Sequence, residues 1–307
     1  MKFGLHLVGL SICLMAGLPP VVLPGEPCKH RASTFDQGES VMSALVVTPG
    51  ISVVTAKRDS VFRLLSMTLC GVADNRELFA GDVNDYLATP FSLSDSTVVL
   101  LRHDQSAAVL VNITTGKHSR FVLPTRVEPQ GVIRYVVGAV IGGRFAWRVN
   151  ALRDSLPPLA PFAEPWLLGE HVGPAAPTVA DVPLSLSAEM RVVARGEDLW
   201  AVRAGTEAER WKLQNGRLTR LFRAAVPASV AIRASPDGDL WIQHNSASSR
   251  SRWTRLNTRL ERIGSAELPR DTRVLAAAAK GGLLVAQLDE VGRSRVFVWT
   301  PAGETAR

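Results

Sequence analysis

A tryptophan-containing phrase recurs near the C-terminus at a nearly constant interval. Asp198-Leu199-Trp200 returns as Asp239-Leu240-Trp241, and Arg210-Trp211 returns as Arg252-Trp253, each about 41 or 42 residues later. A fainter third copy contains Gly282-Leu283-Leu284. A period of about 40 to 45 residues built from short strands is typical of a radial β array, in which each unit buries its faces against its neighbours.

Each unit consists of short runs of β-forming residues separated by turns. In the clearest unit, strands are expected at 230–233, 240–244, 252–256 and 260–263, with Pro-Asp-Gly supplying the first tight turn. The preceding unit repeats this scheme and contains an Asn-Gly step, which is a strong hairpin signal. The last unit offers only three strands, at 274–278, 283–287 and 295–299.

A closed ring would take the missing strand from the other terminus, because an unpaired edge exposes backbone donors and acceptors. The segment 41–48 is expected to pair with 295–299. Weaker repeats upstream bring the total to roughly six units, with five and seven as the alternatives. The sequence therefore predicts an all-β fold, a β-propeller of about six four-stranded blades closed by an N-terminal strand.

The predicted organisation is a signal peptide and cleavage region at 1–25 and a β-propeller domain at 26–307. Met1-Lys2, an apolar stretch and then Pro19-Pro20 are typical of a secretory signal rather than a membrane span. A periplasmic or secreted location follows, with no transmembrane span in the mature chain. A lipid anchor at Cys13 is not expected, because Ile12 stands where a small residue should precede the cysteine.

The segment 156–183 interrupts the repeats with many prolines. Because proline denies a sheet its backbone donors, the segment is expected to be a loop or insertion over one face, with a linker between two halves as the alternative. Its large apolar residues, Phe162 and Trp166, are expected on that loop as a contact surface. Trp200 and Trp241, by contrast, are expected in the core.

The net charge is +7 and the isoelectric point is about 9.8, with arginine supplying most of the positive charge. No nucleic-acid partner is expected, because no run of five basic residues occurs, and an arginine-rich, alanine-rich composition is typical of a bacterial chain. The hydrophobic fraction of 46% excludes wholesale disorder. Seven arginines are expected together on one rim, where an acidic partner would bind: Arg210, Arg217, Arg220, Arg252, Arg255, Arg259 and Arg262.

Two cysteines, Cys28 and Cys70, remain once a signal peptide is removed. An even count fits one disulfide in an oxidising compartment, and two unrelated thiols fit equally well.

The phrase Ser235-Pro236-Asp237-Gly238-Asp239-Leu240-Trp241-Ile242 resembles the Pro-Asp-Gly-Asn-Leu-Trp-Ile phrase of NHL-type and regulator-type β-propeller repeats. The resemblance covers one unit well, two units loosely and the first half hardly at all. It implies the blade and no particular function, because such propellers act as sensors, scaffolds, lactonases and lyases alike.

The inner strands carry arginines rather than metal-binding carboxylates. Lactonase-type propellers hold a divalent cation with Glu, Asp and Asn at inner strand ends, whereas Arg191, Arg233 and Arg273 would favour an anion. We therefore expect no metal, no cofactor and no catalytic residue. The predicted binding residues are Phe162, Trp166, Arg220, Arg233, His244 and Arg262.

These observations favour an exported, monomeric propeller that acts as a non-enzymatic protein-binding or scaffolding module. Two alternatives stay open: a lactonase-like propeller hydrolase or lyase with a pocket at the channel mouth, and a glycan-binding propeller.

Overall fold

A computed structural model describes the chain over residues 32–69, 75–123, 125–128, 131–152, 166–172, 182–183, 186, 190–203, 207–244, 250–269 and 271–301. The regular elements in these ranges are all β-strands, and they form six antiparallel sheets. The same residues contain no helix long and apolar enough to cross a membrane. The predicted signal peptide, Phe162, Cys28 and Cys70 lie outside the described residues.

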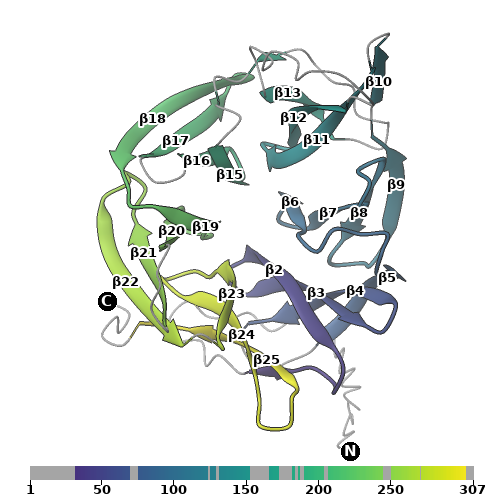
Figure 1. Cartoon of the computed structure of the whole chain (residues 1–307), viewed down its shortest axis with the longest axis vertical. Helices are drawn as coiled ribbons and strands as arrows, with labels where there is room; N and C mark the ends of the chain where they lie inside the picture. Colours follow the sequence, from purple (N-terminus) through teal and green to yellow (C-terminus); the bar gives the residue numbers. More distant parts are fainter. Residues whose placement is uncertain are drawn as a thin grey trace, which may run out of the picture.

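The six sheets are arranged around a central axis like the blades of a propeller (Figure 1). Blade 1 contains β2 (Ser40–Thr48), β3 (Ile51–Arg58), β4 (Val61–Thr68) and β5 (Asn75–Asp82), and blade 2 contains β6 (Phe91–Ser94), β7 (Thr97–Leu101), β8 (Ala107–Asn112) and β9 (His118–Val122). Blade 3 contains β10 (Thr125–Glu128), β11 (Gly131–Ile141), β12 (Arg144–Leu152), β13 (Trp166–His171) and β14 (Val182–Pro183).

The second half of the ring repeats the scheme. Blade 4 contains β15 (Met190–Arg195), β16 (Asp198–Arg203), β17 (Glu207–Gln214) and β18 (Arg217–Ala225), and blade 5 contains β19 (Ser229–Ala234), β20 (Leu240–His244), β21 (Arg250–Leu256) and β22 (Arg262–Pro269). Blade 6 contains β23 (Arg273–Ala277), β24 (Leu283–Leu288), β25 (Ser294–Trp299) and β1 (Ser33–Thr34).

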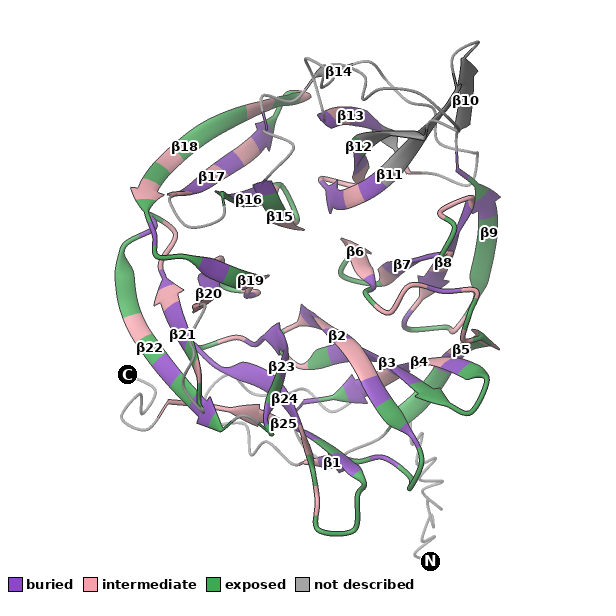
Figure 2. Cartoon of the chain, in the orientation of Figure 1, coloured by how far each residue is buried: buried purple, intermediate pink, exposed green. Residues whose placement is uncertain are grey.

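The first strand of each blade lies innermost, except in blade 3, where β10 precedes the inner strand β11. The inner strands are β2, β6, β11, β15, β19 and β23, and each contacts the inner strands of the two neighbouring blades. Outer strands such as β18 and β22 are largely exposed, while the strands between are buried (Figure 2). This ring of six blades confirms the predicted propeller and its blade number.

The ring has two ends, which differ in their connections. We call the end where the inner strand of a blade turns into the following strand the AB end. The opposite end, where that following strand turns into the next one and where the links between blades lie, is the BC end. Arg195–Asp198 is an AB connection, and the turn between Leu288 and Ser294 is a BC connection.

Among the residues that the structure describes, the hydrophobic core forms six clusters, and each lies between two adjacent blades. Trp200 belongs to the cluster between blades 4 and 5, and Trp241 to the cluster between blades 5 and 6. Both side chains are fully buried, which confirms the prediction that they are core residues. Burial between blades explains why the tryptophan repeats, since each blade presents the same face to its neighbour.

The expected pairing of 41–48 with 295–299 is wrong. Residues 41–48 belong to β2, the inner strand of blade 1, and pair with β3. The partner of β25 is instead β1, through Ser33 opposite Val296 and Thr34 opposite Arg295. The position left open in blade 6 is its outermost, which needs only a short strand, whereas the long apolar run of β2 suits an inner position.

The structure also changes which residues are equivalent in the third strands of blades 4 and 5, compared with the matching Arg-Trp phrases of the sequence. Trp200 lies opposite Arg210, but Trp241 lies opposite Arg255 rather than near Arg252. Arg210 pairs with Asp198 at 3.0 Å, and Arg255 pairs with Asp239 at 2.7 Å. The BC connection of blade 5 is longer than that of blade 4, so the structural equivalents are farther apart in sequence than the matching Arg-Trp phrases.

The proline-rich segment contributes strands to blade 3 where the structure describes it. Trp166 begins β13 and is only 3% exposed, so the expectation that it lies on an exposed loop is wrong. The stretch from Trp166 to His171 contains no proline and can form a ladder with β12. β14 is only two residues long and ends at Pro183.

Candidate binding site in the central channel

The six inner strands enclose a cavity of about 190 Å³ on the propeller axis. Its lining comes from all six blades and consists mainly of alanine, valine, leucine, isoleucine and phenylalanine side chains. Hydroxyl groups come from Ser43, Thr89 and Ser92, and Arg233 is the one charged residue among the described residues that line it. An apolar pocket with a few polar groups is the usual composition of a small-molecule site.

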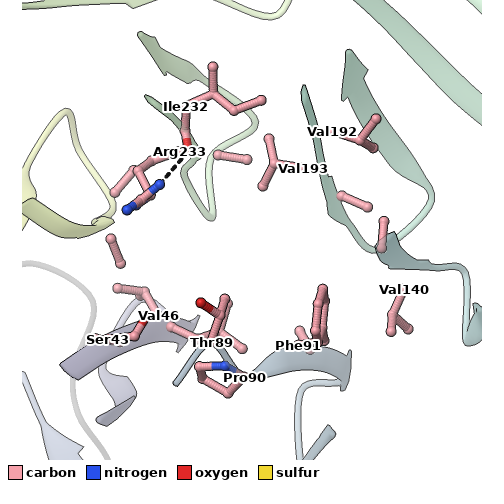
Figure 3. A pocket seen from close by; sticks show the side chains of 18 of the residues that line it. Ser43, Val46, Thr89, Pro90, Phe91, Val140, Val192, Val193, Ile232 and Arg233 are labelled. Atoms are coloured by element: carbon pink, nitrogen blue, oxygen red, sulfur yellow. Dashed lines mark hydrogen bonds between the residues drawn. The ribbon is translucent and has the colours of Figure 1, made fainter. Parts of the chain in front are cut away.

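Arg233 lies on the wall of this cavity, near the end of β19. Its Nε donates a hydrogen bond to the carbonyl oxygen of Leu275 at 3.0 Å, and its Nη1 donates to the carbonyl oxygen of Ile232 at 2.8 Å. Figure 3 shows the side chains of Thr89 and Phe91 across the cavity from Arg233. Within the described part of the chain, Arg233 forms no ion pair with a carboxylate.

The surroundings of Arg233 disfavour the charged form of its guanidinium. Burial lowers the pKa of this guanidinium, and the nearby positive charge of Arg273 lowers it further. Arg273 starts β23 and donates through Nη1 and Nη2 to the carbonyl oxygens of Val41 and Met42 in blade 1. The structure therefore brings Arg233 and Arg273 together around the channel, as the sequence predicted, while Arg191 is exposed at the BC end of β15.

Arg195 spans the channel at the AB end. It is the last residue of β15 in blade 4, and its Nη2 donates to the carbonyl oxygen of Val47 in blade 1 at 2.6 Å, with Nη1 donating to the carbonyl oxygen of Val46. Blades 1 and 4 are opposite in the ring. Burial lowers the pKa of Arg195, and the charges of Asp95 and Asp237 oppose that effect.

A second cavity, of about 430 Å³, lies beyond this arginine at the AB end. It is more open and mixes Arg195 and Lys212 with Asp95, Glu197 and Asp198. The described residues contain no group of three or more His, Cys, Asp or Glu side chains placed to hold a metal ion.

The other residues singled out in the sequence do not form a single site. Arg220, on the outer strand β18, donates to Glu209 at 2.9 Å and lies over the ring of Trp211, with 5.7 Å between its Cζ and the ring centroid. Arg262 is exposed at the start of β22. Arg233 lies in the channel, while His244, in the same blade, ends β20 at the BC end.

The expected arginine rim is only partly present. The side chains of Arg210 and Arg255 are only 13% and 14% exposed and are paired with Asp198 and Asp239, so they stabilise blades rather than face a partner. Sequence reasoning missed Arg195, Thr89 and Phe91 as channel residues. The sequence does show that Arg195 directly precedes a turn glycine at the end of an inner strand. It does not show that the side chain contacts blade 1, because that contact depends on the order of the blades around the ring.

His244 gives the stability a pH dependence that can be measured. Its Nε2 lies 2.6 Å from Oγ1 of Thr254, and its pKa is lowered by burial and by the positive charges of Arg252 and Arg262. Below a pH of about 6.5, where the unfolded histidine takes up a proton, the folded state resists protonation. The stability that is present above that pH is therefore lost as the pH falls through the folded-state pKa.

We expect the free energy of unfolding to fall less between pH 7.5 and 5.5 in His244→Gln than in the wild type, because glutamine can bond to Thr254 without titrating. Urea titrations at both pH values measure this difference. Equal losses in the two proteins would contradict the prediction, and His118→Gln, on the outer strand of blade 2, serves as the control.

No protein-family model matches the chain, and no curated protein matches it. Among solved structures, the β-propeller domain of Cps50 (Swd1) from Myceliophteria thermophila is 10% identical, with 88% of this chain and 99% of that chain covered and a TM-score of 0.46. The WD40 β-propeller domain of Doa1 is 10% identical, with 87% and 95% covered and a TM-score of 0.42. Apo AztD from Citrobacter koseri is 9% identical, with 78% of each chain covered and a TM-score of 0.45. These similarities concern fold class only and do not distinguish NHL-type repeats from other propeller repeats.

Proposed function

We propose that this chain is an exported, non-enzymatic propeller that binds a protein partner on the BC end of its ring. The observation that carries the proposal is a preformed loop between β24 and β25 that presents two apolar side chains to solvent. Leu288 is 66% exposed and Val291 is 58% exposed.

Hydrogen bonds to Asp289 hold this loop in one conformation. Its Oδ1 accepts from the backbone N–H groups of Val291 and Arg293 at 3.1 and 2.8 Å, and its Oδ2 accepts from Arg293 Nε at 3.0 Å. The backbone bond from Arg293 is the main cause of a lowered pKa for the Asp289 carboxyl. A loop that is ordered before binding loses less conformational entropy when a partner docks.

The BC end carries most of the exposed large apolar side chains. Within the described part of the chain there are eight such residues, and five of them lie at this end: Val61, Val122, Val230, Leu288 and Val291. Four of these five belong to the consecutive blades 5, 6 and 1. Exposed apolar side chains concentrated on one face are typical of a protein-binding surface. Arg191 and Arg273 add positive charge at the same end, which favours an acidic partner.

Affinity capture with matched variants tests this proposal. We expect the double variant Leu288→Ser and Val291→Ser to capture at least about tenfold less partner from a periplasmic extract than the wild type does. Its melting temperature should stay close to that of the wild type. Ile263→Ser, at the AB end of β22, also removes an exposed apolar side chain and should leave capture unchanged. Equal capture by the wild type and the double variant would contradict the proposal.

Export is the part of the proposal supported by the sequence alone, through the basic and apolar N-terminus that ends at Pro19-Pro20. Cell fractionation of the native host, with the mature N-terminus determined by mass spectrometry, tests it. Recovery of an uncleaved chain from the cytoplasmic fraction would contradict export without bearing on the binding surface.

A further inference from the structure

The central cavity has features that the proposed protein-binding surface does not explain. Its walls are apolar, its volume is about 190 Å³, and a guanidinium forms part of its lining. An apolar cavity of about 150 Å³ is large enough for benzene, so this cavity has room for a small organic molecule. Burying an arginine in such walls has a desolvation cost that an anionic ligand would offset.

The hydrogen bonding of Arg233 leaves donors for a ligand. A guanidinium has five N–H groups, and the bonds to Leu275 and Ile232 use one on Nε and one on Nη1. The remaining N–H groups have no acceptor among the residues that the structure describes. A carboxylate accepts two parallel bonds from a guanidinium, which is the geometry that arginine recognises best.

The charges around the cavity also favour an anion. Burial, and after it the positive charge of Arg273, lowers the pKa of Arg233. The hydrogen bonds of Arg273 go to the neutral backbone carbonyls of Val41 and Met42 and leave its charge without a carboxylate in the described part of the chain. A negative charge between the two arginines would relieve the repulsion between their positive charges. Ser43, Thr89 and Ser92 provide hydroxyl groups in the same lining.

The apolar walls decide between kinds of anion. Inorganic phosphate would leave most of the lining, including Phe91, Val140 and Val193, without apolar contact. A carboxylate on a short hydrocarbon chain satisfies both the guanidinium and the walls, because each methylene buried against apolar side chains adds to the affinity. Because Arg195 spans the AB end, the ligand would enter from the BC end.

We propose that the central channel binds a short-chain carboxylate, with the carboxylate at Arg233 and the hydrocarbon chain along the apolar walls of the inner strands. The site is separate from the Leu288–Val291 surface and does not depend on a protein partner. A free acid and the C-terminal residue of a peptide share this chemistry, and the test distinguishes them.

Calorimetric titration of the purified protein with hexanoate tests the proposal. We expect hexanoate to bind, hexan-1-ol to bind at least about tenfold more weakly, and inorganic phosphate to bind more weakly than hexanoate. A peptide ending in leucine and its C-terminal amide form the second arm. Tighter binding by the peptide acid than by hexanoate would identify a protein C-terminus as the source of the carboxylate.

Three variants keep the test decisive. Arg233→Gln should weaken hexanoate binding at least about tenfold, whereas Arg252→Gln, an exposed arginine paired with Glu267, should leave it unchanged. Val193→Phe fills the cavity while retaining Arg233, so it should also abolish binding, and melting temperatures check that each variant is folded.

The proposal would be overturned if neither hexanoate nor the peptide bound, if the alcohol bound as tightly as the acid, or if folded Arg233→Gln bound like the wild type. Hexanoate binding should persist in the Leu288→Ser and Val291→Ser variant. Its loss there would also overturn the separate channel site, and loss of partner capture alone would bear only on the proposed function.

Discussion

Trp241→Ala is expected to lower the free energy of unfolding by about 3 to 5 kcal/mol. Trp241 is fully buried between blades 5 and 6, where it packs in a cluster with Trp253, Leu268 and Leu283. Removing the indole leaves a cavity that two sheets with fixed backbones can fill only partly. Urea denaturation followed by circular dichroism measures the loss.

Trp241→Phe separates the packing contribution from that of the indole N–H. The Nε1 atom of Trp241 is buried without a hydrogen-bond partner, so phenylalanine sacrifices no bond and should cost about 1 to 2 kcal/mol through lost volume alone. Val291→Ala, at an exposed position, should change stability by less than about 0.5 kcal/mol. A loss below about 1 kcal/mol in Trp241→Ala would contradict the inter-blade role.

Phe35→Ala is expected to cost about 3 to 5 kcal/mol and to loosen blade 6 first. Phe35 follows β1, is 3% exposed, and packs with Leu284 and Val296 in the cluster between blades 6 and 1. Its backbone N–H also donates to the carbonyl oxygen of Ser294 at 2.9 Å. We propose that this segment closes the ring, because it joins the N-terminal end of the described chain to the last blade.

Hydrogen exchange distinguishes closure from simple core packing. In Phe35→Ala, amides of β25 should exchange at least about tenfold faster than in the wild type, while amides of β16 in blade 4 should change far less. Phe62→Ala, which removes a buried phenylalanine between blades 1 and 2, should not single out β25. Equal acceleration in all blades of Phe35→Ala would contradict a closing role.

The sequence predicted the fold because its repeat is visible in residues that serve the same purpose in each blade. Asp198 begins the second strand of blade 4, Asp239 directly precedes that of blade 5, and Trp200 and Trp241 fill equivalent inter-blade positions. The predicted partner of strand 295–299 is wrong because local β-propensity ranks residues 41–48 above Ser33–Thr34. A two-residue strand such as β1 has almost no local signal, and only the unfilled edge of blade 6 selects it.

The candidate site was less accessible to sequence reasoning. Arg233 and Arg273 were identifiable because both occur on inner strands, whereas the cavity depends on residues contributed by six separate segments. The prediction for Trp166 is wrong because the many prolines in the segment indicate a loop, although the short strand Trp166–His171 itself contains no proline. Contacts such as that of Arg195 with Val47, which are distant in sequence, follow only from the order of blades around the axis.

Arg195 also has a consequence for how the molecule melts. In repeat proteins, each unit is stabilised mainly by its immediate neighbours, so unfolding can begin in one unit and spread. The bonds from Arg195 to Val46 and Val47 instead couple two blades that share no core cluster. Local unfolding of blade 1 would therefore break the bonds from Arg195 and destabilise blade 4 as well. We expect a single cooperative unfolding transition in the wild type and a broadened, multistep denaturation curve in Arg195→Met.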